Sequence, residues 1–256
     1  MSSTPVTDRP LRTAAKVPAV TLAFWVVKVL TTGMGETASD HLATTFDPVV
    51  VVGLSGLVLV ALLAVQVATR RYRPWLYWAA VAMVSVFGTM AADVLHIGLG
   101  VPYAVSTTAF AVAVAAILAV WHAVEHTLDI HSISTVRREL FYWATVLATF
   151  ALGTAAGDLT ATTLHLGYLG SGVLFAVAIA VPAVAYRWGA NPVLTFWIAY
   201  VLTRPLGASF ADWIAVPPGR GGLDLGTGAI TLVLLAAIVV GVAALQRAHL
   251  RTRPAT

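Results

Sequence analysis

The chain has 256 residues, of which 59% are apolar and only 10% are charged. Soluble globular domains carry about 25% charged residues, so this composition argues against a water-soluble enzyme and predicts a polytopic membrane protein. The chain has no cysteine, which excludes disulfides and thiolate metal sites. Its net charge of +4 does not indicate a nucleic-acid partner, because the basic residues lie between apolar runs.

Eight apolar runs follow one another along the chain, each close to the roughly 20 residues that a membrane-spanning helix requires. Each run is expected to be helical, because backbone groups exposed to lipid must form their hydrogen bonds within the segment. The sequence therefore predicts an all-α polytopic membrane protein with eight transmembrane helices. The runs cover residues 17–41, 49–68, 75–98, 102–122, 141–165, 170–186, 193–214 and 227–246.

The basic residues predict the orientation of these spans. Only Arg220 lies in a loop on one side of the membrane, while Lys28 and Arg204 lie within runs. Because positively charged loops stay in the cytoplasm, both termini are expected there. The other twelve basic residues share the cytoplasmic side: Arg9, Arg12, Lys16, Arg70, Arg71, Arg73, Arg137, Arg138, Arg187, Arg247, Arg251 and Arg253.

One spacing, Trp-x9-Gly-x4-Asp, recurs four times and defines an internal repeat. Each unit contains two spans, so all four motif helices are expected to point outward from the cytoplasm, as four parallel two-helix repeats. The motif residues are Trp25, Gly35 and Asp40; Trp78, Gly88 and Asp93; Trp143, Gly153 and Asp158; and Trp197, Gly207 and Asp212.

The repeat units cover about 17–70, 71–122, 138–187 and 190–246, within a single transmembrane domain, 17–246. A cytoplasmic linker, 123–137, joins the two halves, and 1–16 and 247–256 are cytoplasmic tails. Trp and Asp of one motif are separated by about 22 Å of helix. The tryptophans fit an inner aromatic belt, the glycines fit close helix packing, and the aspartates fall together in the outer third of the membrane.

Three segments carry a resemblance to a known family: WVVKVLTTGMGETASD, TLDIHSISTVRRELFYWATVLATFALGTAAGD and FWIAYVLTRPLGASFAD. They resemble the repeat of a bacterial family of uncharacterised membrane-anchored proteins, a repeat of unknown function. The resemblance covers roughly residues 16 to 246. It implies the repeat organisation and a multi-pass protein of the bacterial inner (plasma) membrane, and it brings no activity with it.

Seven ionisable side chains lie within the apolar runs, where each costs about 2.5–3.5 kcal/mol near the bilayer centre. Five are acids: Glu36, Asp40, Asp93, Asp158 and Asp212. The two bases, Lys28 and Arg204, each precede an acid of the same span by eight residues and would act as internal counter-charges. Alternatively, each aspartate neutralises a neighbouring base or caps a helix end.

Carboxylates with few fixed counter-charges suit protons or a hard cation. The leading hypothesis is therefore a secondary transporter or permeation pathway for a proton or a divalent metal ion. The lipid bilayer and this cation are the expected partners. No phosphate-binding loop or dinucleotide fingerprint is present, so no nucleotide is expected. Oligomeric state is left open.

Two alternatives remain. His122, Glu125 and His126 match the His-x-x-Glu-His pattern of zinc metallopeptidases, which allows a membrane-embedded metal-dependent enzyme. A non-catalytic structural or sensory protein is the other. His41, His96 and His165 each follow a repeat aspartate and either extend a metal site or are interfacial polar residues. A divalent metal ion is thus the one cofactor considered.

Overall fold

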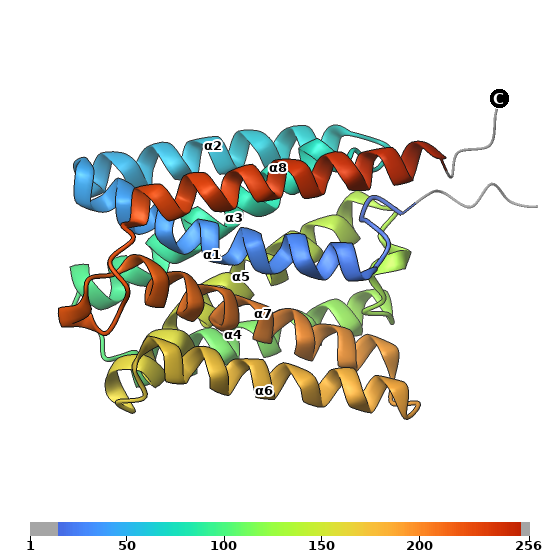
Figure 1. Ribbon diagram of the computed structural model, residues 1–256. Helices are drawn as coiled ribbons and strands as arrows, with labels where there is room; N and C mark the ends of the chain where they lie inside the picture. The colour runs from blue at the N-terminus through green and yellow to red at the C-terminus, as the bar shows by residue number, and fades with distance from the viewer. Residues whose placement is uncertain (1–14, 252–256) are drawn as a thin grey trace, which may run out of the picture.

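In a computed structural model, residues 15–251 are described, and every regular element among them is helical (Figure 1). Arg9, Arg12 and Arg253 of the predicted tails lie outside the described residues. The all-α expectation is confirmed. The elements are α1 (Leu22–Thr45), α2 (Pro48–Ala68), α3 (Pro74–Asp93), η1 (Val94–Gly98), α4 (Tyr103–Glu125), η2 (Ile130–Ser132), α5 (Val136–Asp158), η3 (Leu159–Thr163), α6 (Gly167–Arg187), α7 (Pro192–Ala215), η4 (Pro218–Arg220) and α8 (Thr227–Arg251).

Side-chain caps fix where several helices begin. Asp47 accepts hydrogen bonds from the backbone N–H groups of Val49 and Val50, and Asn191 caps α7 in the same way. Such caps satisfy N–H groups that have no partner within the helix. Proline occupies the first position of α2, α3 and α7, where its missing N–H is not needed.

Seven of the eight long helices are long and apolar enough to cross a membrane, which makes this a multi-pass membrane protein. The helix outside this set is α1, which carries Lys28, Glu36 and Asp40. All residues from 31 to 39 of α1 are buried. This stretch of α1 presents no surface to lipid, so it does not need the apolar composition of the other helices.

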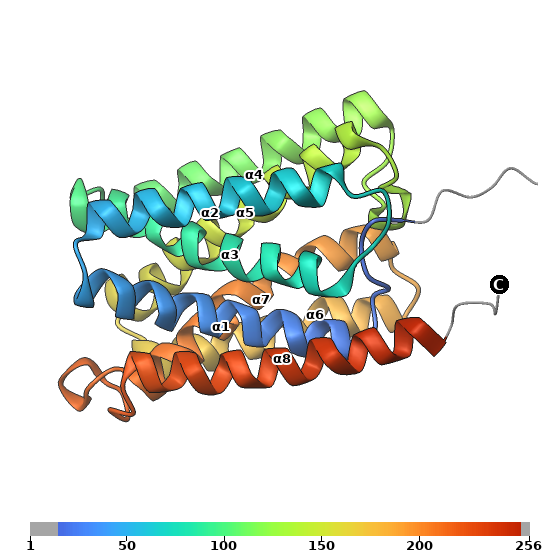
Figure 2. The ribbon, with the colours of Figure 1, turned by 90° about the horizontal axis from the view of Figure 1, so that it is seen from above.

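The four motif helices, α1, α3, α5 and α7, form a closed inner ring, which we call the repeat helices. Each contacts the next along the chain, and α7 closes the ring on α1. The outer helices, α2, α4, α6 and α8, each pack mainly against the repeat helix of the following unit: α2 on α3, α4 on α5, α6 on α7, and α8 on α1. Figure 2 shows the helices alternating in direction, so the repeat helices run the same way.

The repeat glycines are the closest points of approach around this ring. A Cβ atom built on any of them would lie 1.8–2.8 Å from a side-chain atom of the next repeat helix. In each case that neighbour is the residue three positions before the next unit's own glycine. The contacts are Gly35 with Ser85, Gly88 with Phe150, Gly153 with Arg204, and Gly207 with Thr32. Because glycine has only a hydrogen atom as its side chain, neighbouring repeat helices can pack closely enough for the ring to close.

The tryptophans differ from the expected lipid-facing belt. Trp78, Trp143 and Trp197 are buried, and only Trp25 is partly exposed. Their rings pack with neighbouring tyrosines and phenylalanines in one aromatic layer inside the bundle. The belt expectation was wrong for these three because their rings are buried against aromatic side chains of neighbouring repeat helices and do not face lipid at the membrane interface.

Candidate functional site

Arg204 lies at the centre of the ring, fully buried, and its guanidinium contacts all three other repeat helices. It donates hydrogen bonds to the Thr32 carbonyl oxygen at 3.0 Å, to Glu36 Oε2 at 2.5 Å and to Thr154 Oγ1 at 2.7 Å. A further bond reaches the Thr89 hydroxyl. The charge is thus paired and hydrogen-bonded, as a buried arginine requires.

The partners of Arg204 are equivalent positions of the repeat. Glu36, Thr89 and Thr154 each come directly after the repeat glycine of their unit, and the fourth unit has Ala208 there. The fourth unit instead supplies Arg204. The roles of Thr89 and Thr154 were missed from the sequence, although their place after the glycine was a usable signal.

The base–acid pairs expected within single helices do not form. Arg204 pairs with Glu36 of another helix, and Asp212 makes no ion pair within the described chain. Lys28 lies 4.1 Å and 4.3 Å from the ring centres of Phe150 and Tyr200, and its Nζ has no hydrogen-bond partner. The expectation failed because an eight-residue separation places two side chains about 12 Å apart along the helix and about 80° apart around it.

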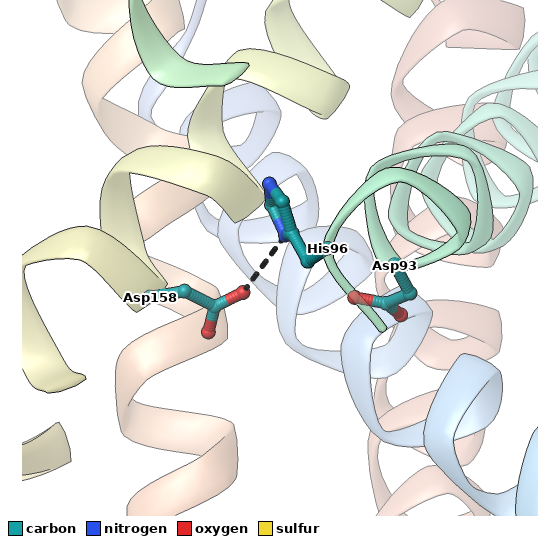
Figure 3. A group of neighbouring side chains, drawn as sticks. All are labelled: Asp93, His96 and Asp158. Carbon is teal, nitrogen blue, oxygen red and sulfur yellow. Dashed lines mark ion pairs between the residues drawn. The ribbon is translucent and has the colours of Figure 1, made fainter. Parts of the chain in front are cut away.

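Asp93, His96 and Asp158, from α3, η1 and α5, come together between neighbouring repeat helices (Figure 3). One ligand atom from each lies within 4.8 Å of the others, and His96 Nδ1 is 3.9 Å from Asp158 Oδ2. The two aspartates are repeat-equivalent and come from α3 and α5. Among residues 15–251, these three side chains form the one group of three or more potential metal ligands.

A wider helical turn follows each of these two aspartates. The π-helical segments η1 (Val94–Gly98) and η3 (Leu159–Thr163) start directly after Asp93 and Asp158. In units one and four the α-helix continues past the aspartate. Single π-turns inside α-helices are often found at functional sites, and here one of them carries His96.

His96 is held in place from its outer side. Its Nε2 lies 2.6 Å from Ser106 Oγ of α4, and its ring packs edge-on against Tyr103. Its Nδ1 is buried and has no hydrogen-bond partner. The free nitrogen is the one that faces Asp158 (Figure 3).

The remaining acids belong to the same electrostatic cluster, which we call the acidic end. Glu36 interacts electrostatically with all four repeat aspartates: Asp40, Asp93, Asp158 and Asp212. Arg220, from the loop before α8, interacts with Asp40 and Asp212 and donates a 3.0 Å hydrogen bond to the Tyr168 hydroxyl. The acids of all four units therefore gather at one end of the bundle.

The other two histidines considered with the repeat do not belong to the group formed by Asp93, His96 and Asp158. His41 and His165 are exposed. His165 has a positive φ of 55°, as does its repeat equivalent Gly100 with 65°; both stand seven residues after the aspartate. His165 therefore corresponds to Gly100 and not to His96, despite the similar local sequences.

The His122, Glu125 and His126 pattern does not form a metal group in the described chain. Glu125 accepts hydrogen bonds from Arg137 and Arg138, the latter at 2.6 Å. His126 ends α4 in a left-handed conformation. The carboxylate is committed to two arginines, which removes the observation that favoured a zinc enzyme.

The family model described as Repeat of Unknown Function (DUF347) matches the chain four times, at residues 23–72, 76–127, 141–189 and 195–250. Each match spans one repeat helix and the outer helix after it. No curated protein and no solved structure matches the chain. The four matches cover most of the sequence and confirm the resemblance, so the chain belongs to this family of repeats of unknown function.

Proposed function

We propose that the protein is a secondary transporter or permeation pathway for a small cation, either a proton or a divalent metal ion. In this proposal all eight long helices cross the bacterial inner membrane, as four parallel repeats with both termini in the cytoplasm. The observation that carries it is the gathering of five carboxylates from four repeat units around a single buried arginine.

The charge balance supports a mobile cation. Among the described residues, Asp40, Asp93 and Asp212 take part in no ion pair, and Arg204 is committed to Glu36. Carboxylates inside a membrane bundle normally pair or mark an ion or proton route. Here the fixed cations are too few, so protons or a bound metal ion supply the missing positive charge.

Arg204 provides a mechanism for release of the transported cation from Glu36. Its guanidinium reaches Glu36 and two repeat threonines, so it occupies the middle of the ring as a tethered cation. An ion that enters at the acidic end competes with Arg204 for Glu36, because both are attracted to the same carboxylate. In the proposed step, Glu36 exchanges its pairing between Arg204 and the transported ion.

The opposite end of the ring is closed by aromatic side chains. The hydroxyl oxygens of Tyr77 and Tyr142 are 2.5 Å apart, and both tyrosines are buried together with Trp78 and Trp143. At the acidic end, by contrast, 19% of the Asp158 side chain is exposed. This arrangement is consistent with access from the acidic end, while passage requires the aromatic layer to open.

Flux measurements test the proposal. Purified protein in liposomes is compared with Asp93→Asn and Asp158→Asn, using internal dyes for pH and for Mn²⁺. Asp129→Asn is the matched control, since its exposed carboxylate lies at the opposite end. We expect both ring variants to stay folded and to lose flux while the control keeps it. Folded ring variants with undiminished flux, or a wild type without flux of either ion, would contradict the proposal.

A further inference from the structure

We infer that Asp93, His96 and Asp158 bind one divalent transition-metal ion between α3 and α5. The inference rests on the proposed function only for the ion's role as the transported cation. The binding itself follows from the geometry of the three side chains.

His96 provides the observation that points to a ligand. Its side chain is 2% exposed, yet Nδ1 has no hydrogen-bond partner and faces Asp158 Oδ2 at 3.9 Å. A buried imidazole nitrogen without a partner is unfavourable unless something binds it. Figure 3 shows the His96 ring between the two aspartates, so a metal ion at that point satisfies the nitrogen and both carboxylates.

The second ring nitrogen of His96, Nε2, has a hydrogen-bond partner, as the non-ligating nitrogen of a metal-bound histidine usually does. Nε2 lies 2.6 Å from Ser106 Oγ, and that hydroxyl lies 3.0 Å from the Tyr103 carbonyl oxygen, to which it donates. With Nε2–H donating to Ser106, the lone pair is on Nδ1 and directed at the metal position. A hydrogen bond of this kind fixes the tautomer and the ring orientation of a ligating histidine.

The separations match a site that contracts slightly on binding. The three ligand atoms lie within 4.8 Å of one another, while two metal–ligand bonds of about 2.0–2.2 Å span at most about 4.4 Å. Small rotations of the carboxylates close this gap. The exposed part of Asp158 gives the ion a way in.

The ligand set indicates the class of metal. Imidazole favours Zn²⁺, Fe²⁺ and similar ions, and carboxylates extend the range to Mn²⁺. The two carboxylates together balance the charge of a divalent cation. One nitrogen and two carboxylate groups favour these ions over Ca²⁺, which takes six to eight oxygen ligands.

Co²⁺ is a suitable probe because its visible absorption reports the ligands directly. The full-length protein, purified in detergent through a tag without histidine, is titrated with Co²⁺ and followed by absorption and calorimetry. We expect one ion per chain. His96→Gln should remove this binding, and Ser106→Ala, which keeps all three ligands, should weaken it about tenfold. His165→Gln is the matched control, since His165 is exposed and lies at the same end.

Each outcome decides the assignment. A wild-type protein that binds no Co²⁺, or equal affinities for His96→Gln and His165→Gln, overturns it. If His96→Gln does not fold, Asp158→Asn against Asp129→Asn decides in the same way. Co²⁺ binding of this kind without ion flux leaves the site standing and rejects transport. Proton flux that needs Asp93 and Asp158, without Co²⁺ binding, rejects the metal site and leaves the proposed function standing.

Discussion

Arg204 and Glu36 are 168 positions apart in the chain, and their side chains meet at 2.5 Å in the middle of the bundle. Neither side chain is more than 6% exposed. The pair joins the last repeat helix to the first, so it holds together the two ends of the ring. Its hydrogen bonds to Thr89 and Thr154 extend that link to the other two repeat helices.

Glu36→Gln should destabilise the protein strongly, because it leaves the Arg204 charge buried without a counter-charge. Removal of one partner of a buried pair typically costs about 3–5 kcal/mol. Denaturant unfolding of the purified protein in detergent, followed by tryptophan fluorescence, measures the change. Glu36→Gln combined with Arg204→Met should recover part of the loss, since the orphaned charge is then gone.

Glu125→Gln is the matched control for that substitution. It also takes a buried carboxylate from arginines, but the side chains of Arg137 and Arg138 are 67% and 26% exposed, so water reaches both of them. We expect only a small change in stability. Equal losses for Glu36→Gln and Glu125→Gln would mean that the Arg204 pair contributes no more than a pair whose arginines are in contact with water.

Gly153→Ala should destabilise the ring at the contact between α5 and α7. The new Cβ would lie 2.2 Å from Arg204 Cγ and 3.0 Å from Pro205 Cδ, and neither atom is at the free end of a side chain. Overpacking of this kind costs about 1–3 kcal/mol. Gly53→Ala on α2 is the control, because its Cβ would meet nothing within 4 Å. Similar melting temperatures for the two variants would argue against close packing at the repeat glycine.

Reporter fusions should divide the connections between the helices into two groups. The α2–α3, α4–α5 and α6–α7 connections lie at the same end as both ends of the described chain, and the α7–α8 connection lies at the other (Figure 1). Fusions at Arg71, Arg138 and Arg187 should therefore report the cytoplasm, and a fusion near Arg220 the opposite side. A cytoplasmic signal at Arg220, or an external one at Arg138, would reject the orientation.

Much of this architecture could be predicted from the repeat spacing. Apolar length and capping residues fix where helices run, and two helices per unit fix that the motif helices are parallel. The spacing of Asp93 and Asp158 from their tryptophans and glycines also predicts that they lie at one depth. These properties depend on one helix at a time, which is why sequence is sufficient for them.

Contacts between helices could not be predicted in the same way. Whether Arg204 faces Glu36 or Asp212 depends on the rotation of neighbouring helices, which residue spacing within one helix does not determine. The π-turns after Asp93 and Asp158 change that rotation locally, and no shared glycine or proline announces them, because Gly157 precedes Asp158 whereas Ala92 precedes Asp93. The direction of His96 follows from such a turn, so the sequence left open whether His96, His41 or His165 extends a metal site at the aspartates.

Lys28 presents the opposite case to Arg204. It is 1% exposed, its Nζ has no hydrogen-bond partner, and its closest favourable contacts are the faces of Phe150 and Tyr200. Cation–π contacts contribute about 0.5–2 kcal/mol each, and they leave Nζ without the hydrogen bonds that it makes in water. The proposed counter-charge role of Lys28 therefore comes at the expense of stability.

Lys28→Met should therefore make the protein more stable, by about 1–3 kcal/mol, because it replaces a buried unsatisfied group with an apolar side chain of similar length. Arg204→Met should have the opposite sign, because it removes a guanidinium group that donates four hydrogen bonds and it leaves Glu36 unpaired. Denaturant unfolding of both variants gives the sign of each change in the free energy of unfolding. If Lys28 acts as an internal counter-charge, ion flux in liposomes should also fall in both variants. A Lys28→Met variant that unfolds as easily as Arg204→Met would show that the ammonium group stabilises the fold. A more stable variant with full flux would remove Lys28 from the transport mechanism.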